Sequence, residues 1–518
     1  MMLPGAVSLG AYEGGAVAAI LLAVQASDGD LVIDAIASAS AGSMTGLIAS
    51  RALLCGSDPI TLMKKTWVDL PSIQTLEADE NLQAPLSMEG LIDGATRLLS
   101  GLEATEDPSR TQGVDVRLSM ALTALGGLTY NFARTEFENP PSGNTPKTDV
   151  LPATTYSDLF DVHLPVGAQN SDFTAALKAA MASGATPVGF PPRLLDRSDD
   201  RASYADKGIV TPPDGQPFKL WYSDGGDIDN QPLGRLIDLI GTIDEGPDQR
   251  VIVMLNIEPA GEPTFQGTWF EKEQPSWLST LLHVNHIRSQ QNLYSDLEQL
   301  EKINQRLRWI DEVASALDRE FDPETRAVAA NLAAERSNID NSLRAKVGAP
   351  QTDGPVPAQT VRELLLQAAG LEGKRQIPVE VISPEIDDTD QLTAKQQLSG
   401  EFLFHFGGFF DATYRGSDFA LGYKDAEGWL TRWLKGQDCE EKVLQALTAG
   451  RASVPPLLEG NASARRLSLV NKIRGVDLLG HIVRVTAYDT GLDIAAETER
   501  VESVLRRVFD VLGKKDEG

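Results

Sequence analysis

The chain has 518 residues, of which 42% are hydrophobic and 23% are charged, values typical of a globular protein with roughly two to four domains. Its 46 Lys and Arg residues against 74 Asp and Glu residues give a formal net charge of −28, which opposes binding to phosphate backbones and anionic membranes. We therefore expect no nucleic-acid partner and no polybasic membrane anchor. Transient contact with a neutral or zwitterionic membrane surface remains compatible with this charge.

The only cysteines, Cys55 and Cys439, exclude a disulfide framework and a zinc site of four thiolates, and they suit a reducing compartment. The apolar segment 15–25, "GAVAAILLAVQ", is similar to the hydrophobic part of a signal peptide, but no Lys or Arg precedes Arg51. No run of about 18 uncharged apolar residues indicates a membrane span. We therefore predict a buried helix over Tyr12–Gln25, no transmembrane segment and a cytoplasmic location.

The first half of the chain alternates apolar strand patterns with helical ones, which is typical of an α/β fold. Residues 60–115 favour helices and loops, and residues 138–149, "ENPPSGNTPKTD", favour a Pro/Gly-rich excursion between two strands. A helix with a polar start and a glycine stop is predicted over 171–184. Strands are predicted at 30–37, 116–125, 158–166, 217–223 and 248–258.

The pattern changes after about residue 275, where long amphipathic helices are predicted up to about 345. One further strand is predicted at about 376–383, and the chain is mostly helical from Glu401 onward. We therefore divide the chain into an α/β domain, 1–275, and a mainly helical C-terminal region, 276–518. The strand at 376–383 is a candidate to return to the first sheet.

A serine stands at the apex of a turn made of small residues, "IASASAGSMTG", between a predicted strand and a predicted helix. Ser40 is flanked two positions away by Ser38 and Gly42, as in a nucleophile elbow, where backbones approach closely. The following helix directs its N-terminal N–H groups toward this serine. Ser43 is expected in the first helical turn. The alternative is a tight turn that simply tolerates small residues.

The stretch "WYSDGGDIDNQP" places Asp224 at the end of an apolar strand, directly before Gly225 and Gly226. In open α/β sheets a carboxylate at the carboxyl end of a strand lies at the edge that carries the chemistry. Two alternatives are an ordinary Asp-Gly turn and a calcium loop from Asp224, Asp227 and Asp229, although the usual bidentate Glu is missing.

The loop "PGAVSLG" opens the first predicted helix and lies between two glycines. Backbone N–H groups in such a loop are suited to stabilising an oxyanion. The candidate donors are the N–H groups of Gly5, Ala6, Val7 and Ser8. The alternative is a glycine turn that binds no ligand.

Together these three segments resemble the patatin-like phospholipases, which carry a G-G-G-x-R-G loop, a G-x-S-x-G elbow and a D-G-G or D-G-A motif in this order. Two further stretches are similar to that family: "AAMASGATPVGFPP", and the extension of "DGGDIDNQP" to Asn230 and Pro232. The resemblance covers about residues 3–260. The loop "GAVSL" and the segment 406–430 also resemble the bacterial branch of patatin-related proteins.

The resemblance implies a three-layer α/β/α sandwich with a mostly parallel sheet, followed by a long helical region. It implies a serine lipid acyl hydrolase of phospholipase A type, without metal or cofactor. Ser40 would be the nucleophile and Asp224 the general base. The implied supporting residues are Ser38 and Gly42 at the elbow, Gly225 and Gly226 beside the aspartate, and the oxyanion loop of Gly5, Ala6, Val7 and Ser8.

Several positions depart from the family pattern. Leu9 stands at the arginine position of the loop, Ala6 and Val7 replace glycines, and Ser38 replaces the first glycine of the elbow. The family places a strand before the loop, but only four residues precede Gly5. We therefore expect this strand to be missing or to begin upstream.

Three alternatives remain open. The first is an esterase, thioesterase or acyltransferase acting on soluble substrates. The second is a catalytically weak scaffold that acts through its helical half, which is also a candidate surface for self-association. The third is a Ser-His-Asp triad; its candidate histidines are His163, His283, His286, His405 and His481.

Overall fold

A computed structural model gives the fold of the chain. The residues that it describes are 1–76, 84, 86–101, 107–136, 147–187, 189–243, 250–257, 277–317, 323–324, 327–328, 331, 360–371, 374–384, 392–401, 405–460 and 462.

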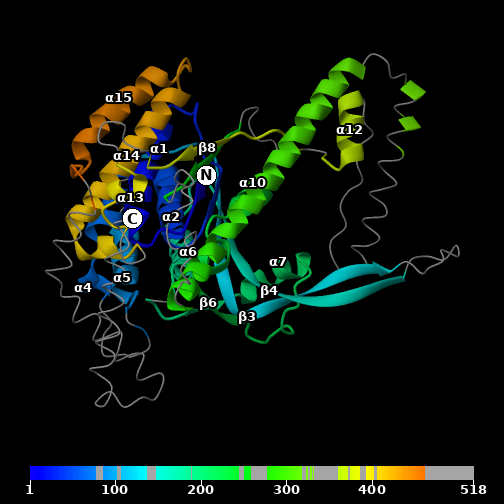
Figure 1. Ribbon diagram of the computed structural model, residues 1–518, viewed down its shortest axis with the longest axis horizontal. Coiled ribbons are helices and arrows are strands. Elements are labelled where there is room, and N and C mark those ends of the chain that lie inside the picture. Colours follow the sequence, from blue (N-terminus) through cyan, green and yellow to red (C-terminus); the bar gives the residue numbers. More distant parts are fainter. Residues whose placement is uncertain are drawn as a thin grey trace, which may run out of the picture.

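The centre of the molecule is a mixed sheet of eight strands in the order β5-β6-β3-β2-β1-β7-β8, with β4 paired to β3 outside this path (Figure 1). Four of the seven pairings are parallel, those of β2 with β1 and β3 and those of β7 with β1 and β8. The others are antiparallel. The strands are β1 Met2–Leu3, β2 Ala35–Ser38, β3 Val116–Glu136, β4 Lys147–Leu164, β5 Arg193–Asp196, β6 Lys219–Ser223, β7 Ile252–Leu255 and β8 Val379–Ile382.

Helices cover both faces of this sheet. The longer ones are α1 Gly10–Ala26, α2 Ala41–Cys55, α5 Glu89–Gly101, α6 Asn170–Ser183, α9 Leu233–Ile240, α10 Trp277–Leu317, α12 Val361–Ala369, α14 Ala412–Trp433 and α15 Glu440–Gly450. Shorter helices are α3 Pro59–Lys64, α4 Ile73–Leu76, α7 Arg201–Asp206, α8 Gly226–Asp229 and α13 Ala394–Gln397. A π-helix, η2, spans Lys65–Asp69, and 3-10 helices include η1 Val7–Leu9, η5 Ser198–Asp200 and η6 Gly407–Phe410.

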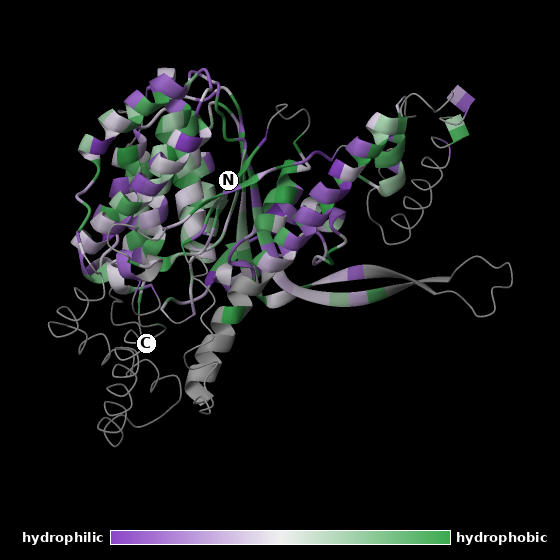
Figure 2. Cartoon of the chain, turned by 45° about the horizontal axis from the view of Figure 1, so that its top comes forward, coloured by the Kyte–Doolittle hydropathy of each residue, from purple (hydrophilic) through white to green (hydrophobic). Residues whose placement is uncertain are grey.

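The alternation of side chains along the strands explains the three layers. Leu3 and Ile36 belong to the main core, which also contains residues of α1, α2, α6 and α14. Met2 and Ala37 point to the other face, where they cluster with residues of α9 and α10. Figure 2 shows both hydrophobic and hydrophilic residues on the helices of the body, and hydrophilic residues on the part of α10 beside α12. The expected α/β/α sandwich is therefore confirmed.

The first helix is a core element, as its uniform apolar character predicts. The segment Val7–Ala26 is long and apolar enough to cross a membrane by length and composition, yet 89% of its most apolar window is buried inside the fold. Two glycines permit close packing of α1 on α14. A Cβ on Gly15 would lie 1.9 Å from the carbonyl oxygen of Phe419, and one on Gly422 would lie 2.0 Å from that of Tyr12.

The C-terminal half contributes to the same body. Strand β8 pairs in parallel with β7, as Ile252 with Val379, so a strand lies where 376–383 was expected. Helix α14 packs on α1 (Figure 1). The division at residue 275 stays a prediction, and most of 318–359 and all of 463–518 lie outside the described residues.

Two expectations about strands need correction. The strand before the first loop is not missing, because β1 is present and its two residues pair with β2 and β7; a start upstream stays a prediction. Strands β3 and β4 form one antiparallel hairpin of 21 and 18 residues, longer than the two short strands expected. Polar residues in this stretch masked the strand pattern, because the far part of the hairpin projects from the body instead of crossing the core (Figure 1).

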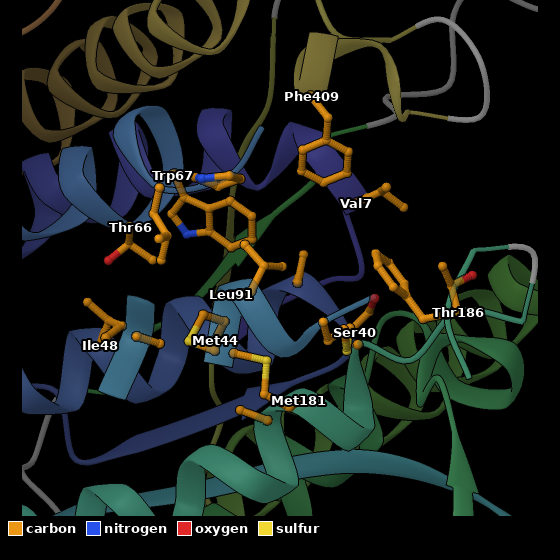
Figure 3. Close-up of a pocket in the computed structure, with 18 of the residues that line it drawn as sticks. Val7, Ser40, Met44, Ile48, Thr66, Trp67, Leu91, Met181, Thr186 and Phe409 are labelled. Carbon is orange, nitrogen blue, oxygen red and sulfur yellow. The ribbon is translucent and has the colours of Figure 1, made fainter. Parts of the chain in front are cut away.

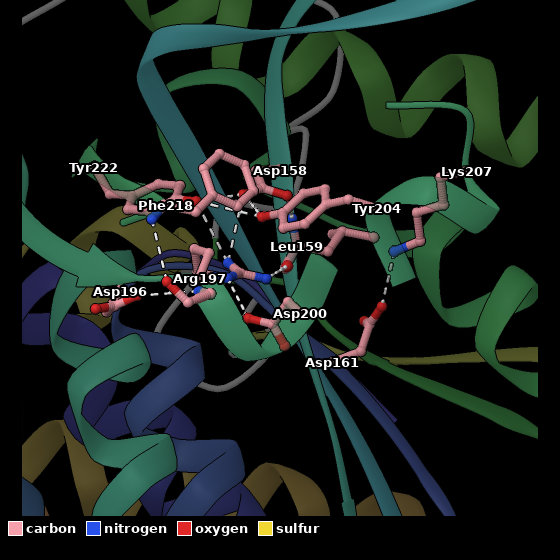
Figure 4. A network of polar contacts seen from close by, with 11 residues as sticks. Asp158, Leu159, Asp161, Asp196, Arg197, Asp200, Tyr204, Lys207, Phe218 and Tyr222 are labelled. Carbon is pink, nitrogen blue, oxygen red and sulfur yellow. Dashed lines mark hydrogen bonds and ion pairs between the residues drawn. The ribbon is translucent and has the colours of Figure 1, made fainter. Parts of the chain in front are cut away.

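A buried polar network fixes the strand that leads to Asp224 (Figure 4). Asp158 of β4 accepts hydrogen bonds from the hydroxyls of Tyr222 at 2.5 Å and Tyr204 at 2.6 Å, and the Arg197 guanidinium lies 3.4 Å away. Arg197 also donates to the carbonyl of Leu159 at 2.8 Å. Tyr222 lies on β6, so these contacts hold that strand to β4 and to the chain around η5.

Candidate active site

Ser40 occupies a strained position between β2 and α2. Its φ of 50° and ψ of −125° place it outside the regions that side chains ordinarily adopt. The helix turns away tightly at Gly42, where a Cβ would lie 2.4 Å from the carbonyl oxygen of Leu3 and 2.6 Å from that of Pro4. This second small position of the elbow therefore tolerates only glycine.

Buried serine hydroxyls support the elbow through hydrogen bonds. The backbone N–H of Ser40 donates to Ser183 Oγ at 2.9 Å, and Ser183 donates in turn to the carbonyl of Ala121 at 2.7 Å. Ser43 Oγ lies 2.8 Å from Ser183 Oγ, and Ser38 Oγ lies 3.3 Å from Ser43 Oγ. Ser38 is fully buried, so a serine fits where the family has glycine. Sequence reasoning missed Ser183, although it lies in the stretch "AAMASGATPVGFPP".

The Ser40 hydroxyl donates a hydrogen bond of 2.7 Å to Asp224 Oδ2. Both residues are almost completely buried, at 6% and 5% exposure. The other oxygen of the carboxylate, Oδ1, accepts from the N–H of Gly226 at 2.7 Å. The Thr123 hydroxyl donates to the carbonyl of Asp224 at 2.7 Å, a support that sequence reasoning also missed. A Cβ on Gly225 would lie only 2.0 Å from the carbonyl oxygen of Ala121.

Asp224 reaches Ser40 by a route other than the one expected. Strand β6 is antiparallel to β3, so Asp224 does not follow a strand parallel to the one that ends at Ser40. Ser223 pairs with Thr123, three residues beyond Met120, which pairs with Ser38. Strand β6 therefore runs back along β3 toward the level of Ser38, and its carboxyl end still lies beside the elbow.

The environment of Asp224 favours its protonated form. Its pKa rises from 3.8 to about 7. Burial is the main cause and the nearby charge of Asp227 adds to the rise, while the hydrogen bonds from Ser40 and Gly226 oppose it. Asp227 itself accepts from Ser223 Oγ at 2.9 Å, and Asp229 lies 3.8 Å from Arg235. No group of three acidic, His or Cys side chains that could hold a metal ion occurs among the described residues. This arrangement does not favour the calcium-loop alternative.

The loop before α1 lies beside Ser40, but two of its four expected oxyanion donors are already used. The N–H of Gly5 donates to the carbonyl of Asn230 at 3.0 Å, and the N–H of Ser8 donates to the carbonyl of His405 at 3.0 Å. The N–H groups of Ala6 and Val7 have no acceptor within the described part of the chain. These two groups are therefore the available donors.

Gly5 makes the approach of this loop possible. A Cβ on Gly5 would lie 2.1 Å from Asn230 Oδ1 and 2.9 Å from Ser40 Cβ. Because Asn230 accepts from Gly5 N–H and follows Asp224 by six residues, it joins the oxyanion loop to the aspartate loop. Leu9, at the position where the resemblance implies an arginine, is fully buried and supplies no charge.

An apolar pocket opens beside Ser40; the space between its lining atoms is about 750 Å³, a volume that includes open solvent. In Figure 3, Ser40 lies at one end, and Met44 and Ile48 continue away from it along α2. Trp67 and Phe409 lie across from α2. Its lining is almost wholly apolar and includes Val7, Ser40, Met44, Ile48, Trp67, Leu91, Ala95, Leu98, Met181, Phe190 and Phe409.

No histidine takes the place of Asp224 in the described structure, since the Ser40 hydroxyl donates to the carboxylate. His163 forms an ion pair with Asp115 at 2.8 Å. This pair lies at the other end of the strands from Ser40, because His163 and Ala35, the first residue of β2, are both register partners of Arg117. His405 meets the oxyanion loop through its backbone carbonyl. The side chains of His283 and His286, and all of His481, lie outside the described residues.

Comparison with known families agrees with this geometry. The family model described as patatin-like phospholipase matches residues 1–237, a range that contains the loop, the elbow and Asp224. A search of curated proteins finds no match. The assignment to the bacterial branch stays a prediction. The match thus identifies residues 1–237, which carry the buried Ser40–Asp224 pair, as a patatin-like phospholipase domain.

Proposed function

We propose that the protein is a serine lipid acyl hydrolase of phospholipase A type, with Ser40 as nucleophile and Asp224 as general base. The patatin-like phospholipase domain at residues 1–237 supports hydrolase action on lipid esters. The observation that carries the finer proposal is the 2.7 Å hydrogen bond from Ser40 Oγ to the buried Asp224, at the end of an apolar pocket. A nucleophile bonded to a base in this way is the geometry that acyl transfer to serine requires.

In the proposed reaction Ser40 Oγ attacks the ester carbonyl carbon while its proton moves to Asp224 Oδ2. The carbonyl becomes an oxyanion that the N–H groups of Ala6 and Val7 stabilise. Collapse of this intermediate breaks the bond to the alcohol, which leaves with the proton from Asp224. Water then attacks the acyl-serine, Asp224 accepts the proton of this water, and the fatty acid departs as Ser40 recovers its hydrogen.

The raised pKa of Asp224 suits this role. A carboxylate with the ordinary pKa of about 3.9 is a weak base toward a serine hydroxyl. Burial, together with the charge of Asp227, brings the pKa to about 7, which strengthens the base while leaving about half of the molecules ionised near neutral pH. A dry site also strengthens the hydrogen bonds to the oxyanion.

The pocket supports a lipid acyl chain as the group bound. Ser40, Met44 and Ile48 line it at intervals of four residues along α2, so it follows the helix for roughly 12 Å. At a projected length of about 1.25 Å per C–C bond of about 1.52 Å, this length holds an acyl chain on the order of ten carbons. Charged or strongly polar acyl groups would find almost no polar partner there.

The alternatives keep distinct expectations. An esterase or acyltransferase for soluble substrates would prefer short or polar acyl groups, and the apolar lining speaks against it. A scaffold acting through its helical half would lack turnover. From the cysteine usage we also infer a cytoplasmic location. From the net charge we infer that contact with lipid surfaces is transient and limited to neutral or zwitterionic ones. Self-association through the helical half stays a prediction.

The first test uses Ser40→Ala and Asp224→Asn against a series of p-nitrophenyl esters and phosphatidylcholine vesicles. We expect each variant to lose about 10²- to 10⁴-fold in kcat, because each removes a reacting group. Ser50→Ala is the matched control, since this buried serine lies on the same helix and donates only to the carbonyl of Gly46. Full activity in either variant would exclude the proposed pair, and loss of activity in a folded His→Ala variant would favour a triad.

The pH dependence tests the base. If Asp224 must be ionised, kcat/KM should rise with pH and level off above an apparent pKa of about 7. Asp227→Asn should move this limb to lower pH, because the charge of Asp227 contributes to raising the pKa of Asp224. Asp238→Asn, at an exposed carboxylate, is the control and should leave the limb in place. A limb near pH 4, or one that Asp227→Asn does not move, would contradict this account.

Chain-length preference tests the pocket. Ile48→Ala should shift the preferred p-nitrophenyl ester toward longer chains by on the order of two to four carbons, because it opens the far part of the pocket. Leu47→Ala is the matched control, since Leu47 is equally buried on the same helix but does not line the pocket. Both changes should lower stability, by about 2–5 kcal/mol. An unchanged preference in Ile48→Ala would remove the acyl chain from this pocket.

A further inference from the structure

A short segment of the C-terminal half, His405–Arg415, lies against the oxyanion loop from about 400 residues away. Ser8 makes the junction and is completely buried. Its N–H and its hydroxyl both donate to the carbonyl of His405, and its Oγ accepts from the N–H of Gly408 at 2.9 Å. The N–H and the hydroxyl of Ser8 are therefore both hydrogen-bonded to this segment, and only its carbonyl is not.

The residue before Ser8 needs such support. Val7 has a φ of 50°, a conformation that β-branched residues rarely adopt and that persists only where the surroundings impose it. On one side the loop is held by Gly5, whose N–H donates to Asn230. On the other side it is held by Ser8. The N–H of Val7, one of the two available oxyanion donors, thus takes its direction from contacts at both ends.

The supporting segment is itself anchored. The buried Arg415 donates to the carbonyl of Gly408 at 2.8 Å, and through Nε and Nη2 to the carbonyl of Val68 at 2.9 and 2.8 Å. Val68 belongs to η2, and the preceding residue of this helix, Trp67, lines the acyl pocket. Arg415 lies in the first turn of α14, which the close contacts at Gly15 and Gly422 hold against α1.

Another residue of the segment reaches the pocket. Phe409 lines it and appears in Figure 3 above Val7. The ring of Phe409 also packs edge-on against Phe406 at 5.8 Å between centroids. The same turn, η6, thus contacts the oxyanion loop and covers the pocket.

We propose that Ser8 is a positioning residue that fastens the oxyanion loop to the C-terminal turn His405–Gly408, so that the Val7 N–H points at the carbonyl carried by Ser40. This inference rests on the proposed acyl hydrolase function and extends it to the C-terminal half. That half completes the active site instead of acting only through separate partners.

The test measures kcat and KM for p-nitrophenyl butyrate, and inhibition by an alkyl trifluoromethyl ketone, whose adduct with serine carries an oxyanion. Ser8→Ala should lower kcat about 10- to 100-fold, less than the removal of a direct donor, with KM changed by less than about threefold. Inhibition should weaken in parallel with kcat. Ser8→Cys, which keeps a weak donor and acceptor, should recover part of the loss.

Two further variants keep the test decisive. Ser417→Ala removes a buried hydroxyl on α14 that accepts from the N–H of Leu458, a residue outside the oxyanion loop. This variant should retain kcat even if it lowers the melting temperature. Gly408→Ala tests the junction from the other side if Ser8→Ala does not fold, because its Cβ would come within 2.7 Å of Ser8 Oγ. Gly408→Ala should also lower kcat and weaken inhibition.

The outcomes separate the two proposals. An active wild-type protein whose Ser8→Ala variant, or whose Gly408→Ala variant where Ser8→Ala does not fold, keeps kcat and inhibitor affinity would overturn this inference alone. A wild-type protein that hydrolyses no ester and binds no ketone would overturn the proposed function and this inference with it. A lower melting temperature with unchanged kcat would reduce Ser8 to a structural residue.

Discussion

The hydrogen bond from Ser40 to Asp224 requires three chain segments to meet more closely than ordinary side chains allow. Gly42 lies against the carbonyls of Leu3 and Pro4 at the end of β1, and Gly225 lies against a carbonyl of β3. Gly5 lets the oxyanion loop lie directly beside Ser40. In each case a Cβ would fall within 3 Å of a neighbouring atom, so the glycines are dictated by backbone approach. The short strands, the tight elbow and the buried serine hydroxyls all serve this meeting point.

The same closeness has a thermodynamic cost. Moving the pKa of Asp224 from 3.8 to about 7 corresponds to on the order of 4 kcal/mol of differential stability. Because the pKa of Asp224 is higher in the folded state, protonation of Asp224 stabilises the fold. This contribution to the free energy of unfolding is fully present below pH 3.8 and is lost as the pH rises toward 7. Around neutral pH the fold therefore tolerates a strained, partly ionised pair, as sites built for catalysis often do. The Asp158 network and the α1–α14 contact supply rigid surroundings for it.

The sequence predicted the local parts of this arrangement well. The apex position of Ser40, the glycine at Gly42 and the aspartate before two glycines follow from short-range rules about turns. The layers follow from strand and helix periodicity. Non-local contacts were not predictable in this way: Ser183 supports the elbow from 143 residues away. The antiparallel direction of β6 and the long β3–β4 hairpin depend on pairing partners that one strand pattern does not specify.

The oxyanion loop illustrates the same limit. Its glycine pattern indicates a run of backbone donors, but only the tertiary contacts decide which remain available. The carbonyls of Asn230 and His405 take up the N–H groups of Gly5 and Ser8, which leaves Ala6 and Val7. A segment beyond residue 400 thus decides a property of residue 8. The helical half, whose role no motif indicates, is part of the site's immediate surroundings.

The most direct measurement is to treat the purified protein with a fluorophosphonate and to locate the adduct by mass spectrometry. We expect a single adduct on Ser40, formed faster as the pH rises through about 7 and sharply slowed in Asp224→Asn. The absence of labelling in the folded protein, or an adduct on another serine, would contradict the claim that the buried Ser40–Asp224 pair is a working nucleophile and base.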